Sequence, residues 1–478
     1  MSAPAQLLEL AEKYWENDVL PTLSEYTRIP CLSPEFDAEW EATGEIMRAA
    51  DLLEQWAAAR SIEGLDVELI RLPRLTPVIL AEVPASGGGG PGEEPATLLY
   101  GHLDKQPPLG EWREGLSPFE PVRDGDNFYG RGTADDGYSI FAALGAAELA
   151  ERTGIGHGRC IVIIEASEES GSPQLGAYLD VLGSRLGPAG PGLVVCLDSG
   201  AETYDRLWAT TSLRGLVAAE LRVDVLSEGI HSGSGGAVVP SSFRILRQLL
   251  SRIEDESSGK LLLDSCRAEV PFGRRQEAEE LVASLGDGVA GDFPTVDGLQ
   301  LAGGLGPVDR VLARTWKASL AFVGADGIPP IADAGNVLRP YTAAKISIRI
   351  PPSADSAAVA EELTRRLTDE PPEGATVTVS DVTPANGFDA PPTAGWLASA
   401  TEEASVAYFG TGVGGMGEGG TIPFLSELLQ SYPAAQFLVT GVLGPGSNAH
   451  GPNEMLHLPT AKRITASVAH VLSRTPRA

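Results

Sequence analysis

The stretch CIVIIEASEES (160–170) joins an apolar run to three acidic residues. Its first half, IVII, holds only branched apolar side chains, which is typical of a strand buried on both faces of a sheet. Glu165, Glu168 and Glu169 then follow within a few positions. Neighbouring carboxylates at the end of a core strand repel one another and lose hydration. The stretch therefore predicts that a positively charged group offsets their charge.

Two further segments share this pattern, ATLLYGHLD (96–104) and GLVVCLDSG (192–200), and a helical pattern lies at 136–154. Strands alternating with helices predict an α/β domain with a mostly parallel central sheet flanked by helices. Ligands of open α/β sheets bind beyond the carboxyl ends of the strands, where all three polar clusters fall. The glycine tract GGGGPGEE (87–94) is interpreted as a hairpin loop between two strands.

The pattern changes after the third of these strands. LVAAELRVDVL (216–226) and AAKISIRIPP (343–352) alternate like half-exposed strands, with helical stretches between them. We therefore predict an α+β unit that is inserted into the first domain. The predicted division of the chain is 1–210 and 386–478 for the first domain, and 211–385 for the insertion.

Charge and cysteine content narrow the class of protein. The 478 residues carry a formal net charge of −30, which would repel nucleic-acid phosphates and anionic membrane surfaces, so we expect neither as a partner. The sequence contains no run of 18 or more apolar residues, so we expect no membrane span. The N-terminal residues show an amphipathic helical pattern rather than a leader. Four widely spaced cysteines without a C-x-x-C pair favour reduced thiols in a cytoplasmic protein.

Few residues can bind a metal in these segments. A lone histidine is more often structural than a ligand, but in His102-x-Asp104 the carboxylate can bond the imidazole from behind and fix its tautomer. In GRGTADDG (130–137), one aspartate of the pair Asp135 and Asp136 is expected to cap the following helix. The other can offer two oxygens to two cations.

Two imidazoles and three carboxylates form the candidate ligand set, which suits zinc, cobalt or manganese. With one carboxylate bridging, each of two cations keeps three protein ligands and an open position for water. Glu168 remains beside this set, where a general base is required. The candidate ligands are His102, Asp135, Glu169, Asp198 and His450.

Five motifs, GHLDKQP, GRGTADDG, EASEESGS, VVCLDSG and SNAHGPNE, resemble in order and spacing the motif series of the M20 metallopeptidase family. The resemblance is strongest to its carnosinase-like and cytosolic dipeptidase branch, and it covers essentially the whole chain. It implies that His102 and Asp198 hold one cation, and that Glu169 and His450 hold the other. Asp135 would bridge the two cations. Asp104 would orient His102, and Glu168 would be the general base. It also implies a cis peptide bond between Asp135 and Asp136.

The same resemblance identifies the insertion as a lid and dimerisation domain, which implies a homodimer. It implies that His231 in IHSG reaches the partner subunit's active site as an oxyanion stabiliser, and that Asn336 contacts substrate from the other subunit. Arg349 would clamp the substrate carboxylate, and the turn EGGTIP, with Gly420 and Thr421, would bind substrate. Without the resemblance, two alternatives stay open. His231 can be an ordinary loop histidine, and Arg349 can be an ordinary exposed strand residue.

The resemblance implies a hydrolase with two divalent cations, zinc or else manganese or cobalt, that cleaves the amide bond of dipeptides or short peptides with a free C-terminal carboxylate. An N-acyl-amino-acid deacylase would use the same centre, and a non-catalytic metal-binding module is a third possibility. Two departures leave the substrate open. Gly137-Tyr138 stands where close dipeptidase relatives have Lys-Gly, and Thr421 stands where they often have serine.

Overall fold

The computed structural model describes residues 3–476 except 87–94, 188–189, 291–292 and 294. The chain forms two compact units, and the second is inserted into the first. The proposed domain boundaries lie at 210 and 385. They put residues 417–426 in the first domain, whereas this segment clusters with the second unit. Unit 1 comprises Met1–Thr211, Ala390–Met416 and Glu427–Ala478, and unit 2 comprises Ser212–Asp389 and Gly417–Ser426.

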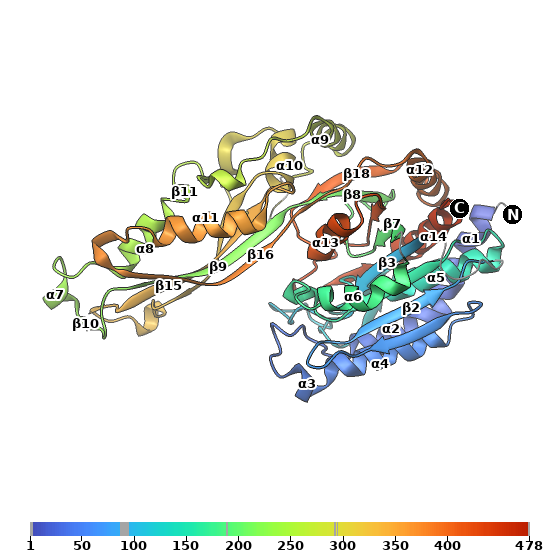
Figure 1. Ribbon diagram of the computed structural model, residues 1–478, viewed down its shortest axis with the longest axis horizontal. Helices are drawn as coiled ribbons and strands as arrows, with labels where there is room; N and C mark the ends of the chain where they lie inside the picture. The colour runs from blue at the N-terminus through green and yellow to red at the C-terminus, as the bar shows by residue number, and fades with distance from the viewer. Residues whose placement is uncertain (1–2, 87–94, 188–189, 291–292, 294, 477–478) are drawn as a thin grey trace. The chain divides into compact units, whose positions relative to one another are not determined.

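A six-stranded sheet forms the centre of unit 1, in the order β1-β2-β6-β3-β7-β19. Figure 1 labels β2, β3 and β7 of this sheet. The strands β6, β3, β7 and β19 run parallel, and β1 and β2 add an antiparallel edge. The predicted α/β class with a mostly parallel sheet is confirmed. The strands are β1 (Asp66–Ile70), β2 (Val78–Val83), β3 (Ala96–His102), β6 (Cys160–Glu165), β7 (Pro191–Cys196) and β19 (Gln436–Val439).

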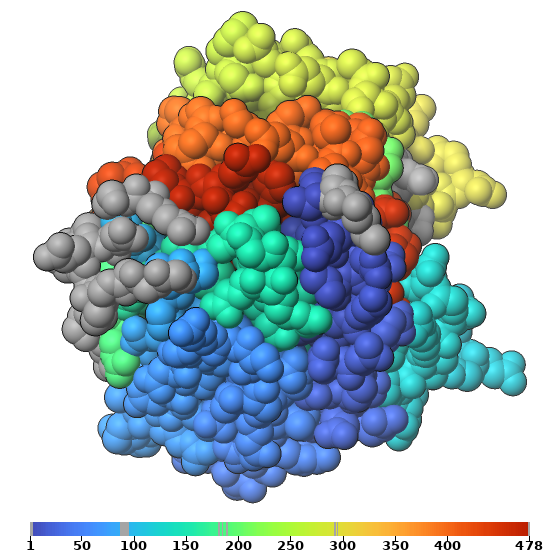
Figure 2. Space-filling model, turned by 90° about the vertical axis from the view of Figure 1, so that its right-hand side faces the viewer, coloured from blue at the N-terminus to red at the C-terminus, as the bar shows by residue number. Residues whose placement is uncertain are grey.

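Burial explains the composition of the central strands. Every residue of β3 and β6 is buried, so neither strand has a polar face. The helices α4 (Glu45–Ala58) and α5 (Ser139–Thr153) pack on this sheet, and α1 (Ala3–Tyr14) and α14 (Leu458–Arg474) pack on α5. The blue N-terminal and dark red C-terminal segments therefore share one face (Figure 2). No helix in the described part of the chain is long and apolar enough to cross a membrane.

The glycine tract predicted as a hairpin loop lies outside the described residues. The strands on either side of it, β2 and β3, are not neighbours, because β6 lies between them in the sheet. The two strands therefore do not form a hairpin. β2 pairs instead with β6, with Val83 opposite Cys160. A pairing between segments so far apart in the sequence has no signature in the local pattern.

Unit 2 is built on an antiparallel sheet in the order β13-β15-β9-β16. β9 (Gly215–Asp224) alternates strictly between buried and half-buried residues, which is the pattern of a sheet covered on one face. The helices α8 (Ser242–Leu250) and α11 (Ser356–Thr368) provide that cover (Figure 1). The predicted α+β insertion is confirmed. The other strands of the sheet are β13 (Ser319–Asp326), β15 (Tyr341–Ile350) and β16 (Thr376–Ala385).

The remaining helices and strands lie around these two sheets. The helices are α2 (Leu20–Thr27), α3 (Trp40–Thr43), α6 (Leu175–Leu186), α7 (Ser232–Gly235), α9 (Phe272–Leu285), α10 (Pro307–Thr315), α12 (Gly395–Phe409) and α13 (Pro423–Ser431). The strands are β4 (Val122–Asp124), β5 (Asn127–Tyr129), β8 (Trp208–Leu213), β10 (Ile230–His231), β11 (Glu254–Asp255), β12 (Lys260–Leu261), β14 (Val337–Leu338), β17 (Phe388–Asp389), β18 (Gly414–Glu418) and β20 (Met455–His457).

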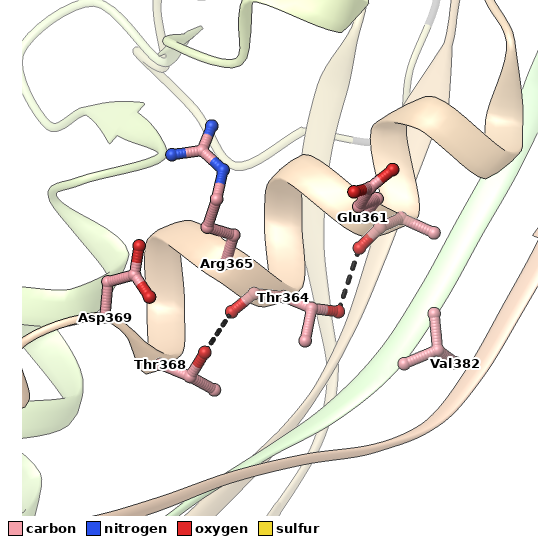
Figure 3. A pocket seen from close by; sticks show the side chains of 7 residues that line it. Glu361, Thr364, Arg365, Thr368, Asp369 and Val382 are labelled. Atoms are coloured by element: carbon pink, nitrogen blue, oxygen red, sulfur yellow. Dashed lines mark hydrogen bonds between the residues drawn. The ribbon is translucent and has the colours of Figure 1, made fainter.

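A shallow depression on unit 2 lies between α11 and Val382 of β16 (Figure 3). Its threonine hydroxyls are used within the helix: Thr364 donates to the carbonyl of Ala360, and Thr368 donates to the carbonyl of Thr364. No residue that the sequence predicts for a site lines it. The residues that the sequence predicts for a metal site lie instead at the strand ends of unit 1.

Candidate metal centre

The polar strand ends of unit 1 meet at one edge of the sheet. β3 ends at His102, which is paired with Glu165 at the end of the parallel strand β6. The turn after β6 carries Glu168 and Glu169, and Asp198 follows the end of β7, the other neighbour of β3. Parallel neighbours end at the same edge, so these side chains lie close together.

The Asp135 carboxylate lies between two imidazoles. Its Oδ1 lies 3.3 Å from Nε2 of His102, and its Oδ2 lies 3.0 Å from Nε2 of His450. Asp135 comes from the loop before α5, and His450 comes from the loop after β19. Two segments far apart in the sequence thus place one carboxylate where it can serve two cations at once.

The two other predicted carboxylate ligands divide between the imidazoles. Asp198 Oδ2 lies 3.8 Å from Nε2 of His102, and Glu169 Oε2 lies 3.2 Å from Nε2 of His450. Glu168 Oε2 lies 4.0 Å from Nε2 of His102. The five predicted ligands and Glu168 therefore lie together. Two sets of potential ligand atoms each fall within 4.8 Å: those of His102, Asp135 and Glu169, and those of His102, Glu168 and Asp198.

The charges of this centre are strongly coupled. Burial acts to raise the pKa of Asp135, but the two imidazoles hold it well below its usual range. Burial acts to lower the pKa of His450, but hydrogen bonds to Asp135 and Glu169 raise it to about 11. Burial and the Asp198 charge raise the pKa of Glu168 well above its usual range. The centre thus holds protons that a divalent cation would displace, and its donors fit such a cation.

Asp104 connects the two parts of the centre. Its carboxylate accepts the backbone N–H groups of Glu168 at 3.1 Å and of Glu169 at 3.0 Å. His102 Nδ1 lies 3.1 Å from the backbone carbonyl of Asp104 and 3.5 Å from its carboxylate. The backbone oxygen is thus the nearer partner of the imidazole. The carboxylate that the sequence assigns to orienting His102 also fixes the acidic turn.

Two further polar residues near the centre have roles that the sequence pattern does not reveal. Glu165 is buried and accepts hydrogen bonds from the hydroxyls of Tyr100 and Ser172, each at 2.7 Å, and of Ser167 at 3.3 Å. Gln106, inside the motif GHLDKQP, donates from Nε2 to Glu169 Oε2 at 2.8 Å. Position within a motif was the one signal available for either residue.

The expectation that one aspartate of the pair caps α5 is wrong. The residue before α5 is Tyr138, and no side chain caps the helix. Instead, Asp136 Oδ2 accepts the backbone N–H of His102 at 3.1 Å. Gly101 is required for this contact, because a Cβ at that position would lie 2.5 Å from Asp136 Oδ2. The peptide bond between Asp135 and Asp136 is cis, as the resemblance implied.

The departure Gly137-Tyr138 has a structural explanation. A Cβ at Gly137 would lie 2.2 Å from Cε1 of Tyr26 and 2.4 Å from the carbonyl oxygen of Gly132, so no side chain fits there. The buried hydroxyl of Tyr138 donates to the carbonyl of Leu197, the residue before Asp198. This tyrosine therefore ties the start of α5 to the segment that carries Asp198.

Two predicted residues lie side by side in unit 2. His231 ends β10 and is paired with Val337 of β14, next to Asn336. The backbone N–H of Ser232 donates to the carbonyl of Asn336 at 2.8 Å. Both side chains are exposed, and Nδ1 of His231 accepts the backbone N–H of Gly233 at 3.1 Å.

The remaining predicted residues form a second group in unit 2. Arg349 on β15 donates from Nη1 to the Thr421 hydroxyl at 2.7 Å, and this hydroxyl donates to the carbonyl of Arg214 at 2.6 Å. Gly420 precedes Thr421, and a Cβ there would meet nothing within 4 Å. Burial and the charges of Arg349 and Arg314 lower the pKa of Arg214 to about 10. Arg214, for which the sequence pattern predicts no role, adds positive charge to this group.

A cluster of carboxylates and imidazoles at the carboxyl ends of parallel strands is typical of metal-dependent hydrolases. The model of peptidase family M20/M25/M40 matches residues 98–474. The chain belongs to this family and is a peptidase.

Individual relatives agree with this assignment. The cysteinylglycine-S-conjugate dipeptidase of Corynebacterium striatum is 26% identical over 425 residues, which is 87% of this chain and 88% of the relative. The human Beta-Ala-His dipeptidase is 25% identical over 388 residues, or 77% of this chain and 73% of the relative. The solved structure of the dipeptidase Dug1p from Saccharomyces cerevisiae superposes with a TM-score of 0.77 at 20% identity, covering 100% of both chains. This last likeness establishes the fold.

Proposed function

We propose that this peptidase is a dinuclear metal-dependent dipeptidase that cleaves the amide bond of dipeptides or short peptides with a free C-terminal carboxylate. One observation carries the proposal: the two oxygens of Asp135 face the imidazoles of His102 and His450 at 3.3 and 3.0 Å. The relatives named as dipeptidases support the substrate class. The four cysteines are buried and free, which supports a cytoplasmic location.

In this proposal His102 and Asp198 hold one cation, Glu169 and His450 hold the other, and Asp135 serves both. Two divalent cations, when bound, polarise the substrate carbonyl and lower the pKa of the attacking water. The mixture of nitrogen and oxygen donors favours zinc, with manganese or cobalt as alternatives.

Glu168 is the proposed general base. Asp104 holds its backbone N–H, and its carboxylate stands 4.0 Å from His102 Nε2. Burial keeps the pKa of Glu168 above that of an exposed carboxylate, so the side chain can take a proton from the attacking water and pass it to the leaving amine.

His231 is the proposed oxyanion stabiliser, supplied by the partner subunit. Because its Nδ1 accepts the N–H of Gly233, the neutral imidazole carries its proton on Nε2. Nε2 is then a hydrogen-bond donor, as stabilisation of a developing oxyanion requires. Asn336, beside it, is the proposed second polar contact to the substrate.

The proposed homodimer forms through unit 2. β13 is an edge strand of the sheet, and Phe322 and Val323 on it are 54% and 58% exposed. An edge strand with exposed large apolar side chains is a surface on which a second strand pairs. A second copy of the chain paired there would bury these side chains. In the proposed dimer, His231 and Asn336 of one chain contact the substrate of the other.

Arg349 is the proposed clamp for the substrate carboxylate. The proton of the Thr421 hydroxyl is directed at the carbonyl of Arg214, while its oxygen accepts from Arg349. Thr421 therefore orients the guanidinium, whose other N–H groups remain to bind a carboxylate in a fork. Gly420 leaves open space beside this group.

Metal analysis combined with a substrate panel tests the proposal. The full chain is stripped of metal and reloaded with Zn²⁺, Mn²⁺ or Co²⁺, and is then assayed on dipeptides, on C-terminally amidated dipeptides, and on N-acetyl and N-succinyl amino acids. We expect two cations per chain and turnover of the free dipeptides. Faster turnover of the N-acyl amino acids would replace the dipeptidase by a deacylase, and metal binding without any turnover would indicate a binding module.

A pair of variants provides the control for metal counting. Asp135→Asn should lose both cations, because it removes one of the two charged oxygens that face His102 and His450. Asp255→Asn should keep both, because Asp255 is an exposed aspartate of unit 2 that accepts from Ser257 and Ser258.

A further inference from the structure

A fully buried carboxylate stands directly behind the centre. Glu454, in the motif SNAHGPNE, accepts four hydrogen bonds. Oε2 accepts from Nη1 of Arg131 at 2.7 Å and from the backbone N–H of Gly132 at 3.0 Å. Oε1 accepts from the backbone N–H groups of Ala134 at 3.0 Å and Asp135 at 3.1 Å. Each carboxylate oxygen thus accepts two donors, which uses its hydrogen-bonding capacity.

All four donors belong to the loop that ends at Asp135. The same loop is held to Glu454 by its backbone as well, because the N–H of Gly130 donates to the carbonyl of Glu454 at 3.1 Å. Gly132 has a φ of 80°, and a Cβ there would lie 2.5 Å from Cε of the buried Lys105. The loop is therefore closely packed, and three of its amides point at the Glu454 carboxylate.

Arg131 extends this connection to His450. Its Nη2 donates to the carbonyl of Gly451 at 2.8 Å, one residue beyond the imidazole that faces Asp135. The ion pair between Arg131 and Glu454 is fully buried and joins positions 323 residues apart. A buried ion pair contributes little net stability compared with apolar side chains of similar size. Its contribution is instead to fix the geometry of the groups around it.

We propose that Glu454 is a positioning residue for the metal centre. Its carboxylate fixes the main chain of Asp135, and through Arg131 it holds the His450 loop at the distance that lets one carboxylate face both imidazoles. Glu454 touches neither substrate nor cation in this role. The inference rests on the proposed dinuclear centre, and it predicts that Glu454 determines the affinity for the cation assigned to Glu169 and His450.

Titration of the metal-free full chain with Zn²⁺ tests this inference, with the heat of binding and the bound metal per chain as readouts. Glu454→Gln keeps the shape of the side chain but turns one acceptor oxygen into an N–H₂ donor that faces backbone N–H groups. We expect affinity for one of the two cations to fall about 10- to 100-fold. Turnover should return toward the wild-type value when Zn²⁺ is raised enough to fill the weakened position.

Glu148→Gln is the matched control. Glu148 is another buried glutamate of unit 1, and its ion-pair partners are Arg60 and Arg152. Its variant should lose stability but bind both cations as tightly as the wild type. If Glu454→Gln behaves in the same way, with a lower melting temperature and unchanged Zn²⁺ affinity, then Glu454 is merely structural and the inference is overturned.

A second variant covers the case in which Glu454→Gln does not fold. Arg131→Lys keeps the charge opposite Glu454, but a single ammonium group cannot also span to the Gly451 carbonyl as the guanidinium does. It should weaken the same cation in the same direction, and wild-type affinity in this variant would count against the inference. A wild-type chain that binds no divalent cation would instead overturn the proposed function, whatever the variants do.

Discussion

The hydroxyl of Tyr100 donates a 2.7 Å hydrogen bond to the buried carboxyl group of Glu165. Two serine hydroxyls, from Ser167 and Ser172, donate to the same group. Ser167 and Ser172 stand on either side of the turn that carries Glu168 and Glu169. Glu165 thus anchors both ends of the acidic turn, a structural role that the motif EASEES does not reveal.

The first prediction concerns the pH dependence of stability. Burial and the Asp104 carboxylate raise the pKa of Glu165 to about 7. The folded protein therefore favours the neutral carboxyl group. The resulting stabilisation is complete below the unfolded pKa of about 4.5 and is lost as the pH rises through 7, a difference of about 3 kcal/mol. Relative to Glu165→Gln, the free energy of unfolding of the metal-free wild type should fall by this order between pH 4.5 and 7.5, measured by urea denaturation.

Tyr100→Phe provides a directional control for this prediction. The phenol hydrogen bond lowers the pKa of Glu165, so its removal should move the loss of stability to higher pH. Parallel pH profiles for the wild type and Glu165→Gln would show that Glu165 titrates in the ordinary range.

A second prediction separates the proposed base, Glu168, from the proposed ligand beside it, Glu169. Glu168→Ala should reduce kcat by at least about 10²- to 10⁴-fold while both cations stay bound. Glu169→Ala, the matched variant one residue on, should lose the cation near His450, because Glu169 Oε2 faces that imidazole at 3.2 Å. Metal content and turnover are measured on the same samples. Loss of metal from Glu168→Ala would reassign this residue as a ligand.

A third prediction uses two inactive variants to test whether His231 acts across the dimer. Glu168→Ala and His231→Ala should each lack turnover alone. In a heterodimer, the chain with intact Glu168 receives His231 from its partner, so one of the two sites is complete. Random mixing after subunit exchange should restore about a quarter of the wild-type activity. If His231 served its own chain instead, the mixture would stay inactive.

A fourth prediction addresses recognition of the substrate carboxylate. Arg349→Lys keeps the charge but loses the fork geometry and the bond to Thr421. KM for free dipeptides should rise roughly tenfold with little change in kcat, as expected when ground-state and transition-state binding fall together. Arg222→Lys on the neighbouring strand, where Arg222 pairs with Asp224, is the control. A rise in KM that is equal for C-terminally amidated dipeptides would show that Arg349 does not bind the carboxylate.

Much of the fold and the centre could be predicted because the signals are local. Three short apolar runs indicate parallel strands, and parallel strands end at one edge of a sheet. One run ends in His102, one precedes the acidic turn after β6, and one precedes Asp198. The position of β6 between β2 and β3 could not be predicted, because strand order depends on pairing between distant segments.

The residues behind the centre carry weaker signals. Glu454 and Gln106 stand in recognised motifs, yet their roles follow from the donors that surround them, and those donors come from other parts of the chain. Asp136 was expected to act within its own helix start, but it accepts the backbone N–H of His102 from another strand. Local preference was overruled by a tertiary contact in each case.

Because the ribosome synthesises the chain from its N-terminus, the segments of the centre become available at different times. The first 200 residues supply His102, Asp135, Glu169 and Asp198, but β19, His450 and Glu454 emerge after the whole of the inserted sheet of unit 2 has been made. Until then the Asp135 loop lacks the carboxylate that receives its amides. A nascent chain should therefore remain without peptidase activity, and without the second cation of the proposed centre, until the segment with His450 and Glu454 has been released and folded.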